Sequence, residues 1–291
     1  MDMPTKPWPT GLSDMVEPLV RRVLAANPSH FTFTGTQTYL VGGGSDVAVI
    51  DPGPDEADHI AAMIAAIGQA RVTAIMCTHT HRDHSPAAAP LSKATGAPVI
   101  GCAPLALDDS GPRSDAPFDH TYAPERVLAD GEQLSGDGWT LTAVATPGHT
   151  SNHLCFALEE SGALFTGDHV MGWSTSVITP PDGDMADYMA SLQKLHERTD
   201  RIYYPAHGPA VERPRQLVRG MIGHRRQRER QILNLLDEAE QPITQMVPRM
   251  YKGVDQILWP AAGRSVLAHL IDLERRGRVS RRGEDWRCAD A

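Results

Sequence analysis

The sequence predicts a layered α/β protein followed by a small, mainly helical C-terminal module. Short apolar, β-branched segments alternate with segments whose apolar residues repeat at helical spacing, as they do where strands feed helices. Some strand-like segments follow one another directly, which favours hairpins among the crossovers. After residue 213 the pattern changes to helices, so we expect two domains, residues 1–212 and residues 213–291.

The first domain is expected to begin with strands, a helix and a buried strand. Three strands are expected first, at residues 31–34, 38–41 and 47–50. The glycine-rich segment 42–46 lies between the last two as a turn, which predicts a hairpin. Apolar residues then repeat at helical spacing from Ile60 to Ile67, and Gly68 ends this helix. Residues 72–77 are short and apolar, which is typical of a buried strand.

The alternation of strands and helices continues to the end of the chain. A surface loop is expected over residues 108–124, which are rich in Asp, Pro, Ser and Gly. The other expected strands lie at residues 98–102, 140–145, 153–158, 163–166 and 202–204. The other expected helices lie at residues 86–95, around Tyr188 to Leu195, and at residues 215–239, 242–250 and 265–276. Residues 279–288 are expected to form a terminal hairpin around Gly283, and helices followed by such a β-wing resemble a winged-helix module.

Composition favours a globular protein of a reducing compartment. The hydrophobic share of 41% is normal for such a protein, and no apolar run approaches the roughly 20 residues that a membrane helix needs. The N-terminal segment lacks the apolar core of a signal peptide. The four cysteines have neither the spacing of a disulfide framework nor that of a zinc-thiolate site. We therefore expect a cytoplasmic location and no membrane partner.

The run from His79 to His84 places four potential metal ligands within six residues. It follows the strand expected at residues 72–77. Alternate residues of an extended segment point the same way, so His79 and His81 can hold one cation. Asp83 and His84 lie past the strand end, where a turn can direct them at a second. Imidazole and carboxylate are ligands of zinc and of other divalent first-row metals, so the run predicts a metal pair.

Three further potential ligands also come just after expected strands. His149 lies in Thr-Pro-Gly-His-Thr, Asp168 in Phe-Thr-Gly-Asp-His, and His207 in Ala-His-Gly-Pro. Each one alone would be interpreted as a surface or capping residue. Because loops after strands can converge on one edge of a sheet pair, all three together with the first motif predict a single site.

These motifs resemble those of the metallo-β-lactamase superfamily, in the order of that family and over most of residues 30–210. The matching features are Asp51 within Ile-Asp-Pro-Gly, the run from His79 to His84, His149, Asp168 and His207. The resemblance implies an αββα sandwich with two metals at one edge. Finer features and the basic C-terminal module are similar to the β-lactamase-like protein 2 group. Its mitochondrial member is regarded as a single-strand endoribonuclease, and related fungal members are thioesterases for carrier-bound polyketides.

Carried over by position, the resemblance implies seven metal ligands. They are His79, His81 and His149 for the first metal, Asp83, His84 and His207 for the second, and Asp168 as the bridge. Asp51 would orient a ligand from behind, as metal-bound histidines usually require. His169 and Trp173 lie next to Asp168 and in the following loop, so they are candidates for a supporting or substrate-contacting role. Two divalent cations are the implied cofactors, zinc by default, with manganese or iron as alternatives.

The expected function is binuclear zinc-dependent hydrolysis. Two divalent cations about 3.5–4 Å apart can share a hydroxide and lower its pKa towards neutrality. This bridging hydroxide is the expected nucleophile, and Asp83 and Asp168 are the catalytic ligands whose negative charge offsets that of the metals. Residues 1–212 carry a net charge of −15, which does not suit a polyanion. An ester, thioester or lactone, either small or carrier-linked, is therefore the favoured substrate.

Three alternatives remain open from the sequence. The main one is a metal-dependent single-strand endoribonuclease, because residues 213–291 carry a net charge of +6, with arginine clusters at residues 225–230 and 275–282. A solvated helix face explains the same arginines. An iron-dependent redox enzyme and a DNA-binding regulator are weaker alternatives, since the ligands of a complete second site are present. The tail could instead cover the site or form a homodimer.

Overall fold

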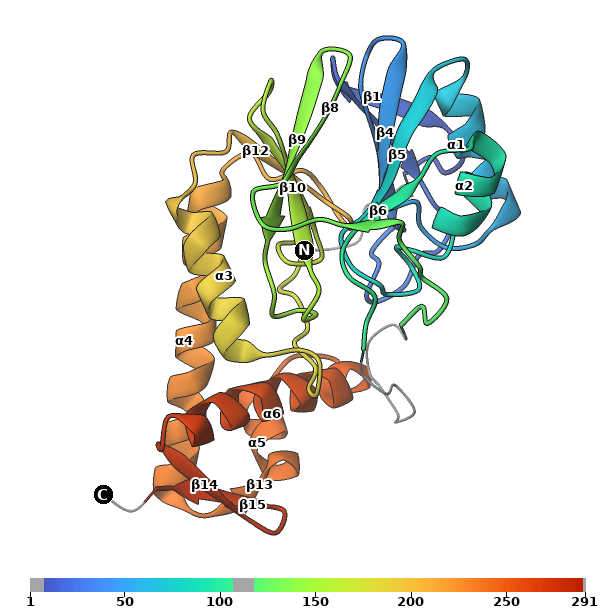
Figure 1. Ribbon diagram of the computed structural model, residues 1–291. Coiled ribbons are helices and arrows are strands. Elements are labelled where there is room, and N and C mark those ends of the chain that lie inside the picture. Colours follow the sequence, from blue (N-terminus) through green and yellow to red (C-terminus); the bar gives the residue numbers. More distant parts are fainter. Residues whose placement is uncertain (1–7, 107–117, 290–291) are drawn as a thin grey trace.

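The computed structural model describes residues 8–106 and 118–289, and two facing β-sheets form its larger domain (Figure 1). The first sheet follows chain order from β1 to β7: Ser13–Glu17, Val20–Leu24, Gln37–Val41, Asp46–Ile50, Arg71–Cys77, Val99–Gly101 and Arg126–Val127. The second sheet has the order β12-β11-β10-β9-β8. From β8 to β12 its strands are Gln133–Gly136, Trp139–Ala145, Leu154–Leu158, Ala163–Gly167 and Ile202–Pro205.

Helices cover the outer face of each sheet, which gives the expected αββα sandwich (Figure 1). Helices α1 (Ala57–Ile67) and α2 (Ala88–Thr95) lie on the first sheet, and α3 (Met185–Glu197) and α4 (Pro214–Glu238) lie on the second. Gly68 ends α1 and Gly96 ends α2, both with positive φ, as the sequence predicts. The side chain of Asp184 caps α3 by accepting from two backbone amides of its first turn.

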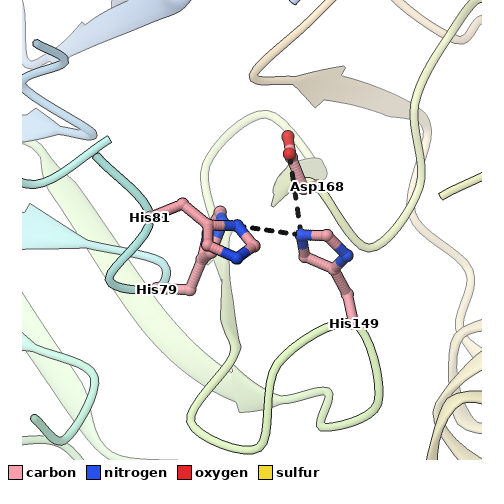
Figure 2. A group of neighbouring side chains, drawn as sticks. All are labelled: His79, His81, His149 and Asp168. Carbon is pink, nitrogen blue, oxygen red and sulfur yellow. Dashed lines mark hydrogen bonds and ion pairs between the residues drawn. The ribbon is translucent and has the colours of Figure 1, made fainter. Parts of the chain in front are cut away.

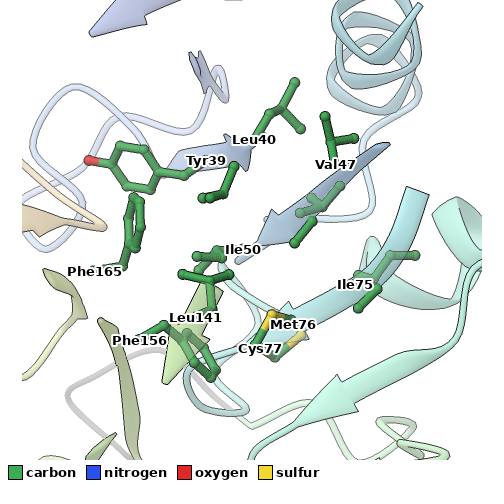
Figure 3. Close-up of a cluster of buried hydrophobic side chains, with 14 of the residues drawn as sticks. Tyr39, Leu40, Val47, Ile50, Ile75, Met76, Cys77, Leu141, Phe156 and Phe165 are labelled. Carbon is green, nitrogen blue, oxygen red and sulfur yellow. The ribbon is translucent and has the colours of Figure 1, made fainter. Parts of the chain in front are cut away.

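The core lies between the two sheets, and strand alternation explains how it is built (Figure 3). In β10, Phe156 and Leu158 point into the layer between the sheets, whereas Cys155 and Ala157 point towards α3. A strand that is buried on both faces has no polar side, so its sequence is a continuous apolar run. Burial on both faces thus explains why these strands were predicted well.

The C-terminal domain has its own small core below the sandwich in Figure 1. It contains β13 (Gln241–Pro242), α5 (Ile243–Met250), the 3₁₀ turn η1 (Gln256–Leu258), α6 (Trp259–Arg275), β14 (Val279–Arg282) and β15 (Asp285–Cys288). The terminal hairpin turns at Gly283 and forms a wing in the order β13-β15-β14. The expected boundary after residue 212 falls at the start of α4. Val218 in α4 packs on the sandwich, while Leu236 packs in the C-terminal core.

The structure differs from the predicted elements mainly at strand edges and helix starts. Residues 31–34 form a turn instead of a strand, with Phe33 at a φ of 57°. Helix α6 begins at Trp259, six residues before the expected start, because proline is tolerated in a first helical turn. Of the expected loop at 108–124, residues 108–117 lie outside the described residues. None of the described helices is long and apolar enough to cross a membrane.

Candidate metal centre

All of the predicted ligands lie past the carboxyl ends of strands, and the sheet topology brings those ends to one edge. His79 to His84 follow β5, which runs parallel to β4, and Asp51 directly follows β4. Asp168 and His207 follow β11 and β12, which also run parallel to each other. The carboxyl ends of parallel strands lie at the same edge of a sheet, so residues far apart in the sequence meet there.

One cluster consists of His79, His81, His149 and Asp168 (Figure 2). The Nε2 atom of His79 lies 2.8 Å from Nδ1 of His81, and Nε2 of His149 lies 3.2 Å from the same atom. The Oδ2 atom of Asp168 lies 3.8 Å from Nε2 of His149. Three ring nitrogens and one carboxylate oxygen therefore converge on a single point.

A second cluster shares Asp168 with the first and adds Asp83, His84 and His207. The Nε2 atom of His207 lies 3.1 Å from Oδ2 of Asp83 and 3.3 Å from Oδ1 of Asp168. The Nε2 atom of His84 lies 3.5 Å from Oδ2 of Asp83 and 3.6 Å from Oδ2 of Asp168. Asp168 Oδ1 thus faces His207, and Asp168 Oδ2 lies between His84 of this cluster and His149 of the first, so this carboxylate is common to both clusters.

The donor atoms of these clusters fit divalent cations. Within each cluster they lie within 4.8 Å of one another, and the histidine side chains are buried. In the described part of the chain, Asp83 Oδ1 and His84 Nε2 are buried without a hydrogen-bond partner. Such atoms are costly to bury, and a bound cation would satisfy them. Imidazole and carboxylate donors suit zinc, iron and manganese, so the residues can hold two such ions.

Hydrogen bonds behind the clusters fix the tautomers of four histidines. In each ring the nitrogen that points away from the cluster donates a proton, which leaves the other nitrogen's lone pair directed at the cluster. The acceptors are Thr78 Oγ1 for His79 (3.0 Å), Asp51 Oδ2 for His84 (3.0 Å), Val177 O for His149 (2.7 Å) and Gly35 O for His207 (3.3 Å). The rings are therefore oriented as ligands by the protein itself.

Asp51 connects the supports of both clusters. It accepts from the backbone amide of Thr78 at 2.7 Å and from the Thr78 hydroxyl at 2.8 Å, in addition to His84. Because the Thr78 hydroxyl donates to Asp51, it accepts from His79. Asp51 has a φ of 48°, a conformation that few non-glycine residues adopt. This strained backbone places one carboxylate behind both clusters, in the position that the sequence resemblance implied.

The backbone before Asp168 is held by close packing against His153. The amide of Asp168 donates to Nε2 of His153 at 3.3 Å, and Nδ1 of His153 donates to Thr146 Oγ1 at 2.9 Å. Gly167 has a φ of 49°, and a Cβ atom there would lie 2.6 Å from Thr78 Oγ1. Only glycine allows this approach. His153 thus positions the carboxylate that the two clusters share.

The loop between β11 and α3, referred to below as the braced loop, is held in place by Arg225, which the sequence did not mark for this role. Ser176 Oγ contacts the carbonyl oxygens of Asp168 and His169 at 2.5 and 3.0 Å, and Arg225 of α4 donates to Ser176 O at 2.5 Å. Arg225 is only 3% exposed and lies 5.1 Å from the ring centre of Tyr188. The expectation that the arginines at 225–230 form a solvated face or an RNA track is therefore wrong for Arg225.

The two weaker candidates occupy different surroundings. His169 is fully buried, its ring lies 4.8 Å from that of Tyr188, and burial lowers its pKa to about 3. It is therefore neutral, and both of its ring nitrogens are buried without a hydrogen-bond partner among the described residues. Trp173 lies 5.1 Å from the ring of Phe33 and lines two cavities next to the braced loop. The position of Trp173 is compatible with substrate contact.

Charge differs between the clusters, and this difference predicts the pH dependence of metal binding. Burial lowers the pKa of His79 well below its usual value. Burial also opposes protonation of His207, but Asp168 and Asp83 outweigh it and raise its pKa to about 9. The neighbouring carboxylates also outweigh burial at His84 and raise its pKa, so at pH 7 a metal must displace protons from the second cluster and none from His79. We expect the affinity for the second cation to rise with pH between 7 and 9, while that for the first changes little.

Calorimetric titration of the chelator-treated protein in two buffers of different ionisation heat would measure the protons released. Proton release confined to the second binding step is the expected result. Equal release in both steps, or none, would contradict the assignment of charge to the two clusters.

The fold and the site together define a class of protein: an αββα sandwich with two adjoining clusters of metal ligands at one edge. The model of the metallo-beta-lactamase superfamily matches residues 31–207, and that of the beta-lactamase associated winged helix domain matches residues 243–286. The chain therefore belongs to the metallo-beta-lactamase superfamily, and it is a metal-dependent hydrolase of that fold.

Similar proteins extend this assignment along almost the whole chain. A beta-lactamase-like protein 2 homolog from Drosophila melanogaster is 34% identical over 274 residues, which cover 89% of each chain. An atrochrysone carboxyl ACP thioesterase from Aspergillus fumigatus is 34% identical over 232 residues, 78% of this chain and 68% of that protein. A solved beta-lactamase domain protein from Burkholderia ambifaria has a TM-score of 0.80 at 19% identity, covering 99% of this chain and 97% of that one. The resemblance to the β-lactamase-like protein 2 group is confirmed.

Proposed function

We propose that this protein is a binuclear, zinc-dependent hydrolase of acyl thioesters, with carrier-linked acyl groups as the main substrate class. The observation that carries the proposal is the complete set of seven ligands in two buried clusters that share Asp168. The similarity to a protein named as an acyl carrier protein thioesterase supports the choice of substrate.

The residues of the site have separate tasks in this reaction. Two cations held here would supply an activated water as nucleophile and polarise the carbonyl oxygen of the substrate. Asp83 and Asp168 would offset the positive charge of the ions, and Asp168, which belongs to both clusters, would contribute to each site. Asp51 and Thr78 keep His79 and His84 in the required tautomers. Because these groups are ordered before substrate arrives, little reorganisation is needed during the reaction.

Three arginines of the two arginine clusters are placed in a way that favours an acyl substrate over RNA. Arg225 is buried, Arg276 pairs with Glu229 at 2.7 Å, and Arg275 pairs with Asp184. An arginine that is buried or ion-paired is not available as part of an exposed track for phosphates. The first domain, residues 1–212, carries a strongly negative net charge, which repels a polyanion.

Zinc and a cytoplasmic location complete the proposal. Zinc suits the mixed histidine and carboxylate donors, although iron and manganese accept the same ligands. The four cysteines are free thiols, three of them buried, which suits a reducing compartment. A homodimer stays a prediction.

Turnover of two substrates by the zinc-loaded protein tests the function. We expect cleavage of an acyl thioester that is lost in Asp168→Ala and is insensitive to salt, and we expect single-stranded RNA to stay intact. RNA cleavage that is lost in the same variant and falls steeply with salt would instead establish the endoribonuclease. Activity that survives in Asp168→Ala would come from a contaminant and would leave the proposed site without support.

A further inference from the structure

A cavity of about 270 Å³ lies where the braced loop meets the C-terminal domain, and we refer to it as the interdomain cavity. One wall is the loop between β11 and α3, which passes above α6 in Figure 1, and the other walls come from α4, the segment after α5, and α6. Most of the lining is apolar or aromatic, including Phe31, Met171, Trp173, Leu258 and Ala262.

Two arginines of α4 line this cavity without a carboxylate partner. Arg225 and Arg228 form no ion pair with any described residue, and no Asp or Glu is among the described residues that line the cavity. The Nε atom of each is buried and has no hydrogen-bond partner in the described part of the chain. Arg228 donates through Nη1 to Gln231 and to the carbonyl of Met250, both of which are neutral.

A buried guanidinium without a counter-charge is unfavourable, because it loses hydration and gains no ion pair in return. Here one buried arginine, Arg225, and one half-buried arginine, Arg228, lie three residues apart on one helix and face one cavity together with His224. Burial and both arginines lower the pKa of His224 to about 4, so this imidazole is neutral, and the positive charge on the α4 wall of the cavity comes from the two arginines. An anion within the cavity would remove the electrostatic cost.

The loop that lines the interdomain cavity also supports the metal centre. Ser176 and Val177 line it, and the same residues bond to Asp168 O and to Nδ1 of His149. A ligand in the cavity therefore lies one residue layer from the metal ligands. A substrate whose reacting bond is at the metals would therefore bring another part of itself to the arginines by passing around this loop.

We propose that the interdomain cavity binds an anionic group of the substrate, a carboxylate or a phosphate carried on an apolar chain, with Arg228 and Arg225 as its counter-charges. The carboxylate would belong to the far end of the acyl group, and the phosphate to the arm that carries it. This proposal rests on the proposed thioesterase function, which supplies the reaction, and adds where an anionic part of the substrate binds.

Direct binding tests the cavity without relying on catalysis. The zinc-loaded protein is titrated calorimetrically with hexanoate and hexyl phosphate, and with hexanol as the neutral probe. We expect at least one anion to bind at least tenfold more tightly than hexanol, and Arg228→Met to remove this advantage. Arg230→Met is the matched control, because Arg230 carries the same charge on the exposed side of the same helix. Anion binding that is equal in wild type and Arg228→Met would place the anion at the metals and overturn the proposal.

Arg228 also donates to the carbonyl of Met250 and lies 4.2 Å from the ring centre of Tyr251, so its replacement could lower stability. A second variant separates a loss of binding from a loss of folding. Ser265→Asp places a carboxylate on the α6 wall of the cavity and keeps both arginines. We expect it to weaken anion binding at least tenfold with no fall in Tm. Unchanged anion binding in Ser265→Asp would contradict the proposal.

Kinetics then identify the source of the anion. A preference for adipoyl over hexanoyl N-acetylcysteamine that Arg228→Met removes indicates a carboxylate on the acyl group. A preference for hexanoyl-coenzyme A over the hexanoyl N-acetylcysteamine thioester that is lost in the same way indicates a phosphate on the arm. Arg228-dependent anion binding without any thioester cleavage would leave the cavity supported and refute the thioesterase function. Thioester cleavage together with anion binding that does not depend on Arg228 would support the thioesterase function and refute the role of the cavity.

Discussion

Replacing Asp168 by Asn is expected to lower kcat/KM for an acyl thioester by roughly 1000-fold, which corresponds to about 4 kcal/mol of transition-state stabilisation. Asp168 is the residue that both clusters share, and its two oxygens face His207 and His149. An amide keeps the shape of the side chain but removes its negative charge and one ligand atom. The two ions would then repel each other at close range with less anionic compensation.

Metal analysis by mass spectrometry separates the causes of this loss. We expect the Asp168→Asn protein to retain fewer than two zinc ions per chain after dialysis, with a circular dichroism spectrum like that of the wild type. Asp130→Asn is the control, because Asp130 is exposed and pairs with Lys194 on the surface. Two retained ions and nearly full activity in Asp168→Asn would refute its role as the bridge.

The sequence could indicate which residues would lie together because the signal for each of them is local. Each ligand stands a few residues after a strand that is buried on both faces, and such strands are recognisable as short apolar runs. Once the strands are placed, the parallel arrangement of β4 with β5 and of β11 with β12 brings their carboxyl ends together. The convergence of His79, Asp168 and His207 could therefore be expected from their places after strands, and the family resemblance supplied their assignment as ligands.

The elements that were missed carry little local signal. The edge strand β1 is largely exposed, and β2 contains two arginines, so neither has the apolar alternation of a strand. Phe and Thr alternate at residues 31–34, which made this segment resemble a strand, but Phe33 is buried in a turn against the distant Trp173. In these places tertiary contacts, not local preference, decide the backbone.

The supporting contacts of the site were hidden for a different reason. Val177 and Gly35 support His149 and His207 through backbone carbonyls, which every residue type offers. The inward position of Arg225 depends on which side of α4 meets the braced loop, and helical spacing fixes only that Arg225 and Arg228 share a side. Only the structure shows that this side is buried, because Met221 of α4 and Tyr188 of α3 belong to the same buried cluster.

Substitution of Asp51 by Asn is expected to weaken zinc binding by roughly 10- to 100-fold, with a comparable loss of activity at limiting zinc. Asp51 touches no metal, but it accepts three hydrogen bonds, one of them from His84 and one from the Thr78 hydroxyl that supports His79. An amide can accept at only one of its two heavy atoms, so one donor would face the NH₂ group. Asn also tolerates the positive φ of this position, so the backbone strain is not increased.

The matched control lies at the other end of the same strand. Asp46 is 5% exposed and accepts from the Trp139 indole at 2.9 Å and from the Asp137 amide at 3.0 Å, and the latter bond lowers its pKa most. Asp46→Asn should therefore lower Tm while leaving zinc affinity unchanged, whereas Asp51→Asn should lower zinc affinity, and excess zinc should restore much of its activity. Competition with a chromophoric chelator measures the affinities. If both variants lost zinc affinity equally, the effect would come from general destabilisation, and Asp51 would not be a specific support of the ligands.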